Sequence, residues 1–192
     1  MAFRRERLCK AAIAEAIPLA KELNDMPALA VALFFAAHLA QFEGNHAEVE
    51  QFALDLIELS TRQNFAIWLP IGAIFRGWAR TASGDTAEGL SWIENGIGDY
   101  RATGAMILTS YFLALKAEAL HLSDRTPEAL EAISEAEALV ERSEERFWCA
   151  ELRRLRGVLL ATVGADETKI EVSFCEAIRI AKEQKSVSLA HV

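Results

Sequence analysis

Turn-forming residues recur in this chain at intervals of forty residues, at Gly44, Gly84, Asp124 and Gly164. A second series with the same interval places small residues at Ala37, Gly77, Ala117 and Gly157. The first series closes apolar stretches of helical periodicity, and the second lies where two helices need to approach closely. A self-similar interval of this length is typical of helix pairs that bury their apolar faces only by stacking on their neighbours. The sequence therefore predicts a tandem array of helical repeats.

The composition excludes several other classes of protein. The chain has 192 residues, and 52% of them are hydrophobic, which is enough to build a core. The formal net charge of −8 leaves no strongly basic surface, so nucleic acid and anionic membranes are poor partners. The uncharged stretches are too short or too interrupted to span a bilayer, and the N-terminus lacks the pattern of a secretion signal.

The three cysteines, Cys9, Cys149 and Cys175, are an odd number without CxxC spacing. We interpret them as free, partly buried thiols of a reducing compartment. Together with the absence of a secretion signal, this predicts a cytoplasmic protein.

The expected fold is all-α: an α-solenoid of antiparallel helix hairpins, wound as a right-handed superhelix. Apolar residues recur at i, i+3, i+4 and i+7 with no sustained strand-like alternation. The predicted helices cover residues 5–23, 27–43, 46–63, 66–82, 86–103, 106–122, 127–143, 147–163 and 168–184. Loops of two or three residues make paired helices antiparallel. Pro18 and Pro70 fall inside predicted helices, where each should kink the helix or shift its start.

The interval divides residues 1–192 into one solenoid with irregular ends. An incomplete unit covers 1–25, repeats cover about 26–64, 65–104, 105–145 and 146–185, and a further helix starts at 186–192. Terminal units without a polar outer face leave apolar surface in need of a cover. Either the chain is cut from a longer polypeptide, which we favour, or its ends dock onto a partner or a second copy as a homodimer.

Residues 100–105, 110–119 and 140–157 carry a resemblance to a known class of repeats. They are similar to the tetratricopeptide-type C-terminal repeats of multidomain bacterial signalling proteins, most specifically over about 76–183. In that family a class III adenylate or guanylate cyclase domain and a nucleotide-binding ATPase module usually precede the repeats. The resemblance implies a regulatory or partner-sensing segment of a cytoplasmic signalling protein. It transfers no cyclase activity, because this chain contains neither upstream module.

The chain departs from that family at several positions. Asp124-Arg125 and Ser143-Glu144 stand where glycine turns are usual, which leaves the shape of those two loops open. Cys149 stands where an acidic residue is frequent, so a charge-based role there is in doubt.

Catalytic motifs are missing from the sequence. There is no phosphate-binding GxxxxGK[ST] loop, GxGxxG fingerprint, HExxH pair or GxSxG turn. His46 and Glu50 share a helix face, but two ligands without a third make a poor metal site. Cys149 is better explained as a packed core cysteine than as a reactive thiol. We therefore predict a protein that is not an enzyme and needs no cofactor or metal.

Residues near the small crossing positions on the inner stripe of the first helices are the candidate binding residues: Phe34, His38, Ile74, Trp78, Tyr111, Glu118, His121, Glu151 and Arg154. Aromatic and apolar anchors in the first half and ionic groups in the second suit an extended peptide or a partner helix. Arg154 would be available for a carboxylate. The structural alternative is that Phe34, Ile74 and Trp78 pack between hairpins, and that Glu118 and Arg154 form an ion pair between repeats.

Four other aromatic residues, Trp92, Phe112, Phe147 and Trp148, are predicted to belong to the core between adjacent hairpins.

The leading function is a protein-interaction and regulatory module that binds a protein or peptide. One alternative is a small-ligand sensor, for which we would expect an enclosed cavity containing Tyr111, Glu118 and Arg154. A third is self-assembly through uncapped ends.

Overall fold

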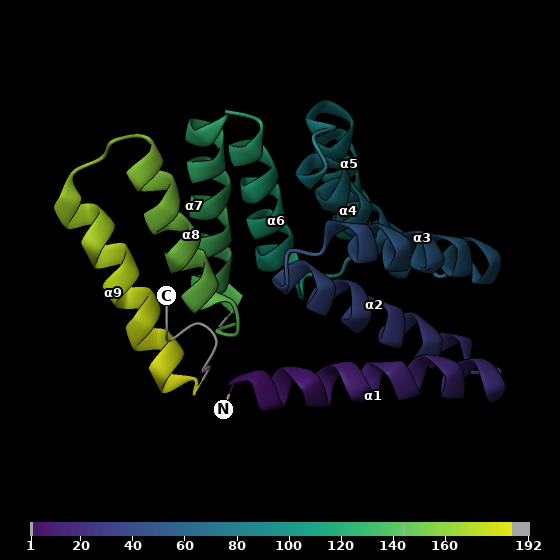
Figure 1. Ribbon diagram of the computed structural model, residues 1–192. Coiled ribbons are helices and arrows are strands. Elements are labelled where there is room, and N and C mark those ends of the chain that lie inside the picture. The colour runs from purple at the N-terminus through teal and green to yellow at the C-terminus, as the bar shows by residue number, and fades with distance from the viewer. Residues whose placement is uncertain (1, 144, 186–192) are drawn as a thin grey trace. The chain divides into compact units, whose positions relative to one another are not determined.

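The computed structural model describes residues 2–143 and 145–185, and this part of the chain folds into helices joined by short turns without any strand (Figure 1). The helices are α1 (Ala2–Glu22), α2 (Met26–Phe42), α3 (His46–Gln63), α4 (Trp68–Ala82), α5 (Thr86–Ala102), α6 (Thr109–Leu122), α7 (Thr126–Ser143), α8 (Cys149–Thr162) and α9 (Glu167–Glu183). Every predicted helix is present, with its ends within three residues of the prediction. The all-α fold class is confirmed. The predicted helix start at 186–192 lies outside the described residues.

The forty-residue markers all adopt the left-handed backbone conformation. The φ angles are 68° at Gly44, 101° at Gly84, 59° at Asp124 and 67° at Gly164. A left-handed residue after the last helical turn is a common helix ending, and glycine adopts it at least cost. Asp124 shares this backbone region with the three glycines, so its turn does not differ from theirs in this respect.

A second series of left-handed residues lies at the ends of the other helices. Asn24, Asn64 and Gly104 have φ angles of 53°, 55° and 81°, again forty residues apart. Asparagine tolerates this region better than most side chains because its short polar group can bond locally. The sequence signal for these turns was present but not used in the prediction.

The small-residue series lies where paired helices touch. A Cβ atom on Gly77 of α4 would stand 2.5 Å from the carbonyl oxygen of Gly89 on α5. On Gly157 of α8 it would stand 2.9 Å from the ring of Phe174 on α9. Ala37 and Ala117 are completely buried. These positions allow the two helices of each hairpin to approach closely, as predicted.

The chain divides into two compact units, Met1–Ala105 and Met106–Val192. In the first unit α1 to α5 pack on their sequential neighbours, and α2 also contacts α4. In the second unit α6 to α9 do the same, and α6 also contacts α8. We call α2, α4, α6 and α8 the first helices of their hairpins, because contacts between them form one layer of each unit.

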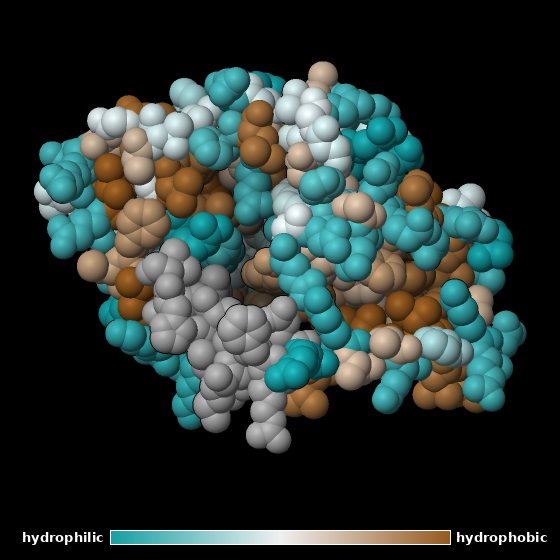
Figure 2. Space-filling view, viewed as in Figure 1, coloured by the Kyte–Doolittle hydropathy of each residue, from teal (hydrophilic) through white to brown (hydrophobic). Residues whose placement is uncertain are grey.

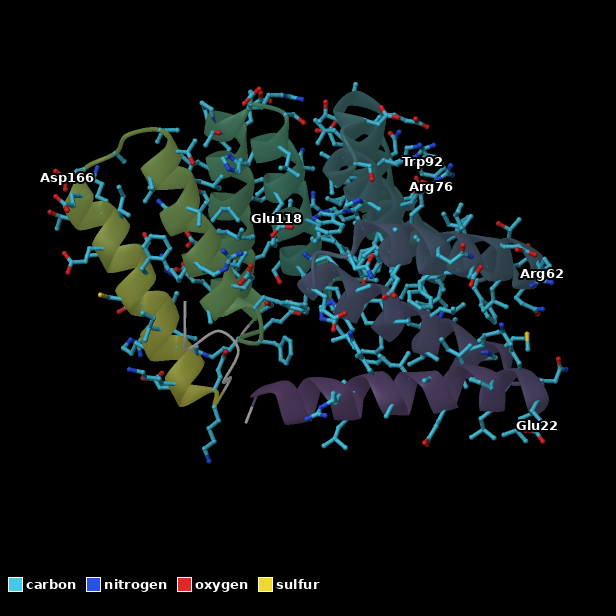
Figure 3. All side chains as sticks on the ribbon, viewed as in Figure 1. Glu22, Arg62, Arg76, Trp92, Glu118 and Asp166 are labelled. Atoms are coloured by element: carbon cyan, nitrogen blue, oxygen red, sulfur yellow. The ribbon has the colours of Figure 1, made fainter. Side chains whose placement is uncertain are left out.

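Two predictions about local structure need correction. Phe112 and Trp148 are buried as predicted, but Phe147 is 71% exposed and Trp92 is half-buried. Phe147 lies in the turn before α8, and its ring meets Trp148 edge-on, with centroids 4.7 Å apart. Trp92 lies beside Arg76, whose guanidinium carbon is 4.5 Å from the indole centroid (Figure 3). Of these four aromatic residues, Trp148 and Phe112 are therefore the two that belong to the core.

The cysteines and prolines also lie in identifiable places. Cys9 and Cys175 are exposed, so the prediction of partly buried thiols is right only for Cys149. Burial raises the pKa of the Cys149 thiol, which disfavours the reactive thiolate. Pro70 is the third residue of α4, and this helix begins two residues later than predicted, consistent with a shifted start. Pro18 lies inside α1.

Candidate binding surfaces on the first helices

An aromatic stack joins α6 to α8 in the second unit. Tyr111 on α6 and Trp148 at the start of α8 lie face to face, with ring centroids 4.2 Å apart and an interplanar angle of 20°. Tyr111 is buried, and its burial raises the pKa of the phenol, with the negative charges of Glu118 and Glu151 adding to the effect. The hydroxyl is therefore neutral at physiological pH.

An ion pair on α8 lies beside this stack. Arg154 donates from Nε to Glu151 Oε2 at 2.9 Å and from Nη2 to Oε1 at 2.6 Å, a two-pronged arrangement across one helical turn. Glu151 is buried, and its hydrogen bonds raise the pKa of Arg154. Since Arg154 already holds a carboxylate, the expectation that it would be available for a partner's carboxylate is not supported by the geometry.

Glu118 completes the group from α6 (Figure 3). It is half-buried, and its charge raises the pKa of both Tyr111 and Arg154, which places it within electrostatic reach of both groups. We call Tyr111, Glu118, Trp148, Glu151 and Arg154 the α6–α8 cluster. Its ionised members are two carboxylates and one guanidinium, so the cluster carries a formal charge of −1.

His121 contacts the start of the next helix. Its Nδ1 lies 3.2 Å from the Oγ1 of Thr126, the first residue of α7. The residue therefore serves the turn between α6 and α7, although it shares a helix with Tyr111 and Glu118.

Two candidate residues of the first unit, Phe34 and His38, belong to an aromatic cluster between α2 and α4. The Phe34 ring lies parallel to His38, with an interplanar angle of 10°. It also meets Trp68 and Phe75 of α4, each at a centroid distance of 5.9 Å. Burial lowers the pKa of His38 to about 4, so the imidazole is neutral at pH 7.

The two remaining candidates are core residues of α4. Ile74 is fully buried and packs closely on Gly96 of α5: a Cβ atom added to this glycine would lie only 2.7 Å from Ile74 Cγ1. Trp78 is also buried. For Ile74 the geometry favours the packing alternative, because a partner could not reach the side chain without opening the hairpin.

An apolar groove between α1 and α2 was missed by the sequence prediction. It has a volume of about 660 Å³, and its lining includes Ile13, Ala28, Val31, Phe35, Leu39 and Phe42 together with the predicted site residue His38. Hydrophobic atoms gather over these two helices (Figure 2). Val31, Phe35 and Leu39 are spaced four residues apart, so the stripe was visible in the sequence. We call this feature the α1–α2 groove.

A smaller polar hollow of about 380 Å³ lies between α8 and α9, lined by Arg153, Arg156 and Lys169 among others. Glu137 of α7 neutralises part of this basic edge, with its carboxylate oxygens 3.1 Å from each arginine. Burial raises the pKa of Glu137, although the two arginines oppose the effect. Neither this hollow nor the α1–α2 groove contains Tyr111, Glu118 and Arg154, where a small-ligand sensor was expected to have its cavity.

Among the side chains that the structure describes, those of residues 7–143 and 145–185, no group of three or more histidine, cysteine or acidic residues is placed to hold a metal ion. In the same part of the chain, every helix is too short or too polar to cross a bilayer.

The sequence matches no protein-family model. It is 29% identical over 116 residues to the uncharacterized protein R02095 of Rhizobium meliloti (strain 1021). The alignment covers 60% of this chain but only 11% of that protein.

Solved structures of repeat proteins resemble the chain in fold. Bacillus thuringiensis PlcR, in complex with the peptide PapR7 and DNA, matches with a TM-score of 0.78 at 17% identity, over 95% of this chain and 65% of PlcR. RapI in its apo form matches with a TM-score of 0.69 at 10% identity, over 98% of this chain and 75% of RapI. The nearly identical TPR-like repeats of a Podosopora anserina kinesin light chain match with a TM-score of 0.58 at 14% identity, over 96% of this chain and 89% of that chain. The chain therefore has a tetratricopeptide-like helical-repeat fold.

Proposed function

We propose that this chain is a non-catalytic protein-interaction and regulatory module, and that the α6–α8 cluster binds a protein or peptide segment. The observation that carries the proposal is the ionic group Glu118, Glu151 and Arg154 beside the Tyr111–Trp148 stack. Core packing needs none of these charges, because partly buried ions cost desolvation that an apolar core avoids. Glu118 and Arg154 are only half-buried, so their charges lie at the surface beside the buried stack, where a partner's polar groups can reach them.

The charge of the cluster indicates what it prefers. Glu118 places a half-buried carboxylate beside the stack, and a carboxylate favours a lysine or arginine side chain of a partner over an acidic one. This reverses the earlier expectation of a partner carboxylate. The likeness to PlcR, whose structure contains the peptide PapR7, supports peptide binding in this fold.

A peptide array with systematically varied charge tests this function. We expect basic peptides to bind better than acidic ones, and Glu118→Gln to weaken binding of the best peptide about fivefold or more because it removes a carboxylate from the cluster. Glu128→Gln is the matched control, since Glu128 is exposed on α7 and pairs with Arg125. Equal binding by wild type and Glu118→Gln, or a preference for acidic peptides, would show that the cluster is not the binding surface.

We propose further that the module is a sensor or scaffold arm of a cytoplasmic signalling protein linked to a nucleotide cyclase or ATPase. The resemblance of residues 76–183 to repeats of such proteins supports this context. So does the length of the Rhizobium meliloti relative, of which the aligned region is only 11%. Reading the neighbouring coding sequence tests it: a cyclase or ATPase module in the same frame is expected, and an unrelated gene with its own stop would refute the link.

A further inference from the structure

The α1–α2 groove exposes a helix face that is buried at the equivalent positions of the next repeat. Val31 is 41% exposed and Phe35 is 51% exposed. Forty residues later, Ile71 is 2% exposed and Phe75 is fully buried. These residues belong to the first helices α2 and α4 of the same unit, so the difference arises from what covers each helix.

In α4, the covering side chain comes from the preceding first helix. Phe34 of α2 lies 5.9 Å from both the Phe75 ring and the Trp68 indole, measured between centroids. A helix that covered α2 in the same way would bring an apolar side chain onto Phe35. The contact between α2 and α4 therefore indicates the shape and polarity of a helix that would fit against the exposed face of α2.

One repeat position has a smaller side chain in α2 than in the later repeats. This position is Trp68 in α4, Leu108 before α6 and Trp148 before α8. Trp68 and Trp148 each contact an aromatic ring on the preceding first helix of their own unit. In α2 the position is Ala28, which lines the groove. Because α2 supplies only a methyl group there, the occupant has to provide the apolar bulk itself.

We propose that the α1–α2 groove binds an amphipathic α-helix of a partner protein, whose apolar face places an aromatic side chain over Ala28 and Phe35. Helix binding in an apolar groove through anchors one turn apart is a recurring mode of recognition. The walls are held together by the Lys10–Glu43 ion pair, at 2.8 Å, which links α1 to the end of α2.

A second copy of this chain does not supply that helix through α2. The aromatic residue that would have to enter the groove is Phe34, and it is already enclosed by Trp68 and Phe75 of its own unit. The occupant is therefore a helix whose apolar face is otherwise open.

The chain offers a probe of the required chemistry. A synthetic peptide of residues 26–42 with glutamate tails, which the α6–α8 cluster is expected to disfavour, presents an apolar first helix with an aromatic residue at the covering position. Its Phe34→Ser version is the matched control peptide. By NMR titration of the full chain, we expect saturable binding with shifts at Val31 and Phe35, and binding about tenfold weaker for the control peptide.

Protein variants complete the test. Phe35→Glu should weaken peptide binding about tenfold, whereas Leu54→Glu, at an exposed apolar position of α3, should leave it unchanged. Circular dichroism confirms that both variants are folded. Glu118→Gln should also leave it unchanged, so this proposal can fail separately from peptide binding at the α6–α8 cluster.

Three outcomes would overturn the proposal. Binding that Phe35→Glu does not affect would mean that the peptide displaces α2 or binds elsewhere. Dimerisation of the chain alone that Phe35→Glu abolishes would identify a second copy as the occupant. Binding of a short fatty acid at the groove, with no binding of either peptide, would identify it as a small-molecule site.

Discussion

Tyr111 and Trp148 are stacked 4.2 Å apart across the α6–α8 contact, whereas Phe147, the residue next to Trp148, is largely exposed. The stack joins two hairpins of the second unit, and it forms one wall of the proposed binding cluster. The stability of this unit therefore depends on the pair of rings beside which the proposed binding charges lie.

Replacing Trp148 with alanine should lower the free energy of unfolding by about 3–5 kcal/mol, because it removes a buried aromatic side chain from between two hairpins. Phe147→Ala is the control, and its expected effect is about 0.5 kcal/mol, typical of an exposed position. Urea denaturation followed by circular dichroism measures both. Equal losses would mean that the stack is not part of the core.

Two glycines should respond to alanine with opposite signs. Gly77→Ala would place a methyl group 2.5 Å from a backbone oxygen of α5, and we expect a loss of about 1–3 kcal/mol from overpacking. Gly98→Ala meets nothing within 4 Å on the exposed side of α5 and should gain about 0.5–1 kcal/mol from helix propensity. In thermal melts, we expect the midpoint of Gly77→Ala to lie below that of the wild type and the midpoint of Gly98→Ala to lie above it.

Stability should fall in mild acid because of His38. Its pKa in the folded chain is about 4, below the ordinary 6.5, so the unfolded chain binds the proton more readily. The contribution is complete above pH 6.5 and is lost as the pH falls toward 4, amounting to about 2 kcal/mol between pH 7 and pH 5. His38→Gln should remove this part of the pH dependence. The two chains would show parallel profiles if His38 were ordinary.

Tyr111 predicts a loss of stability in alkali. Burial raises its pKa well above the usual 10.0, so above pH 10 the unfolded chain releases the phenolic proton more readily than the folded chain does. The contribution is present below pH 10 and is lost as the pH rises. In the Tyr111→Phe variant, the midpoint of urea unfolding should fall less between pH 10 and pH 11 than it does in the wild type. An unchanged slope would contradict the buried environment.

Replacing one member of the Glu151–Arg154 pair should lower the free energy of unfolding more than replacing both. Arg154→Met leaves a buried carboxylate without its two donors, and we expect a loss of about 1–3 kcal/mol, reduced by the partial exposure of the arginine. The double variant Glu151→Gln with Arg154→Met should recover at least half of that loss. Additive effects in this cycle would show that the two groups do not interact.

The sequence predicted the helices well because their signals are local. Gly44, Gly84 and Gly164 end helices through a backbone conformation that depends on the residue itself, and the apolar period identifies each helix. The small residues at Gly77 and Gly157 were likewise readable, since close helix approach requires the absence of a side chain.

The candidate sites were predicted less well, because the direction of a side chain depends on its neighbours in space. Arg154 was expected to meet a partner, but its Glu151 lies one turn away on the same helix. Ile74 shares the inner stripe of the repeat with Phe34, yet it packs on Gly96 because that glycine admits it. Phe147 and Trp148 are equivalent as aromatic residues in sequence, and only the turn before α8 separates exposed from buried.

The forty-residue interval by itself determined the order, length and pairing of the helices, since turn chemistry and periodicity act over a few residues. Only the tertiary structure decided which faces of those helices stay open. Val31 and Phe35 look like core residues in the sequence, and they line a groove because burial is a property of what packs against a residue.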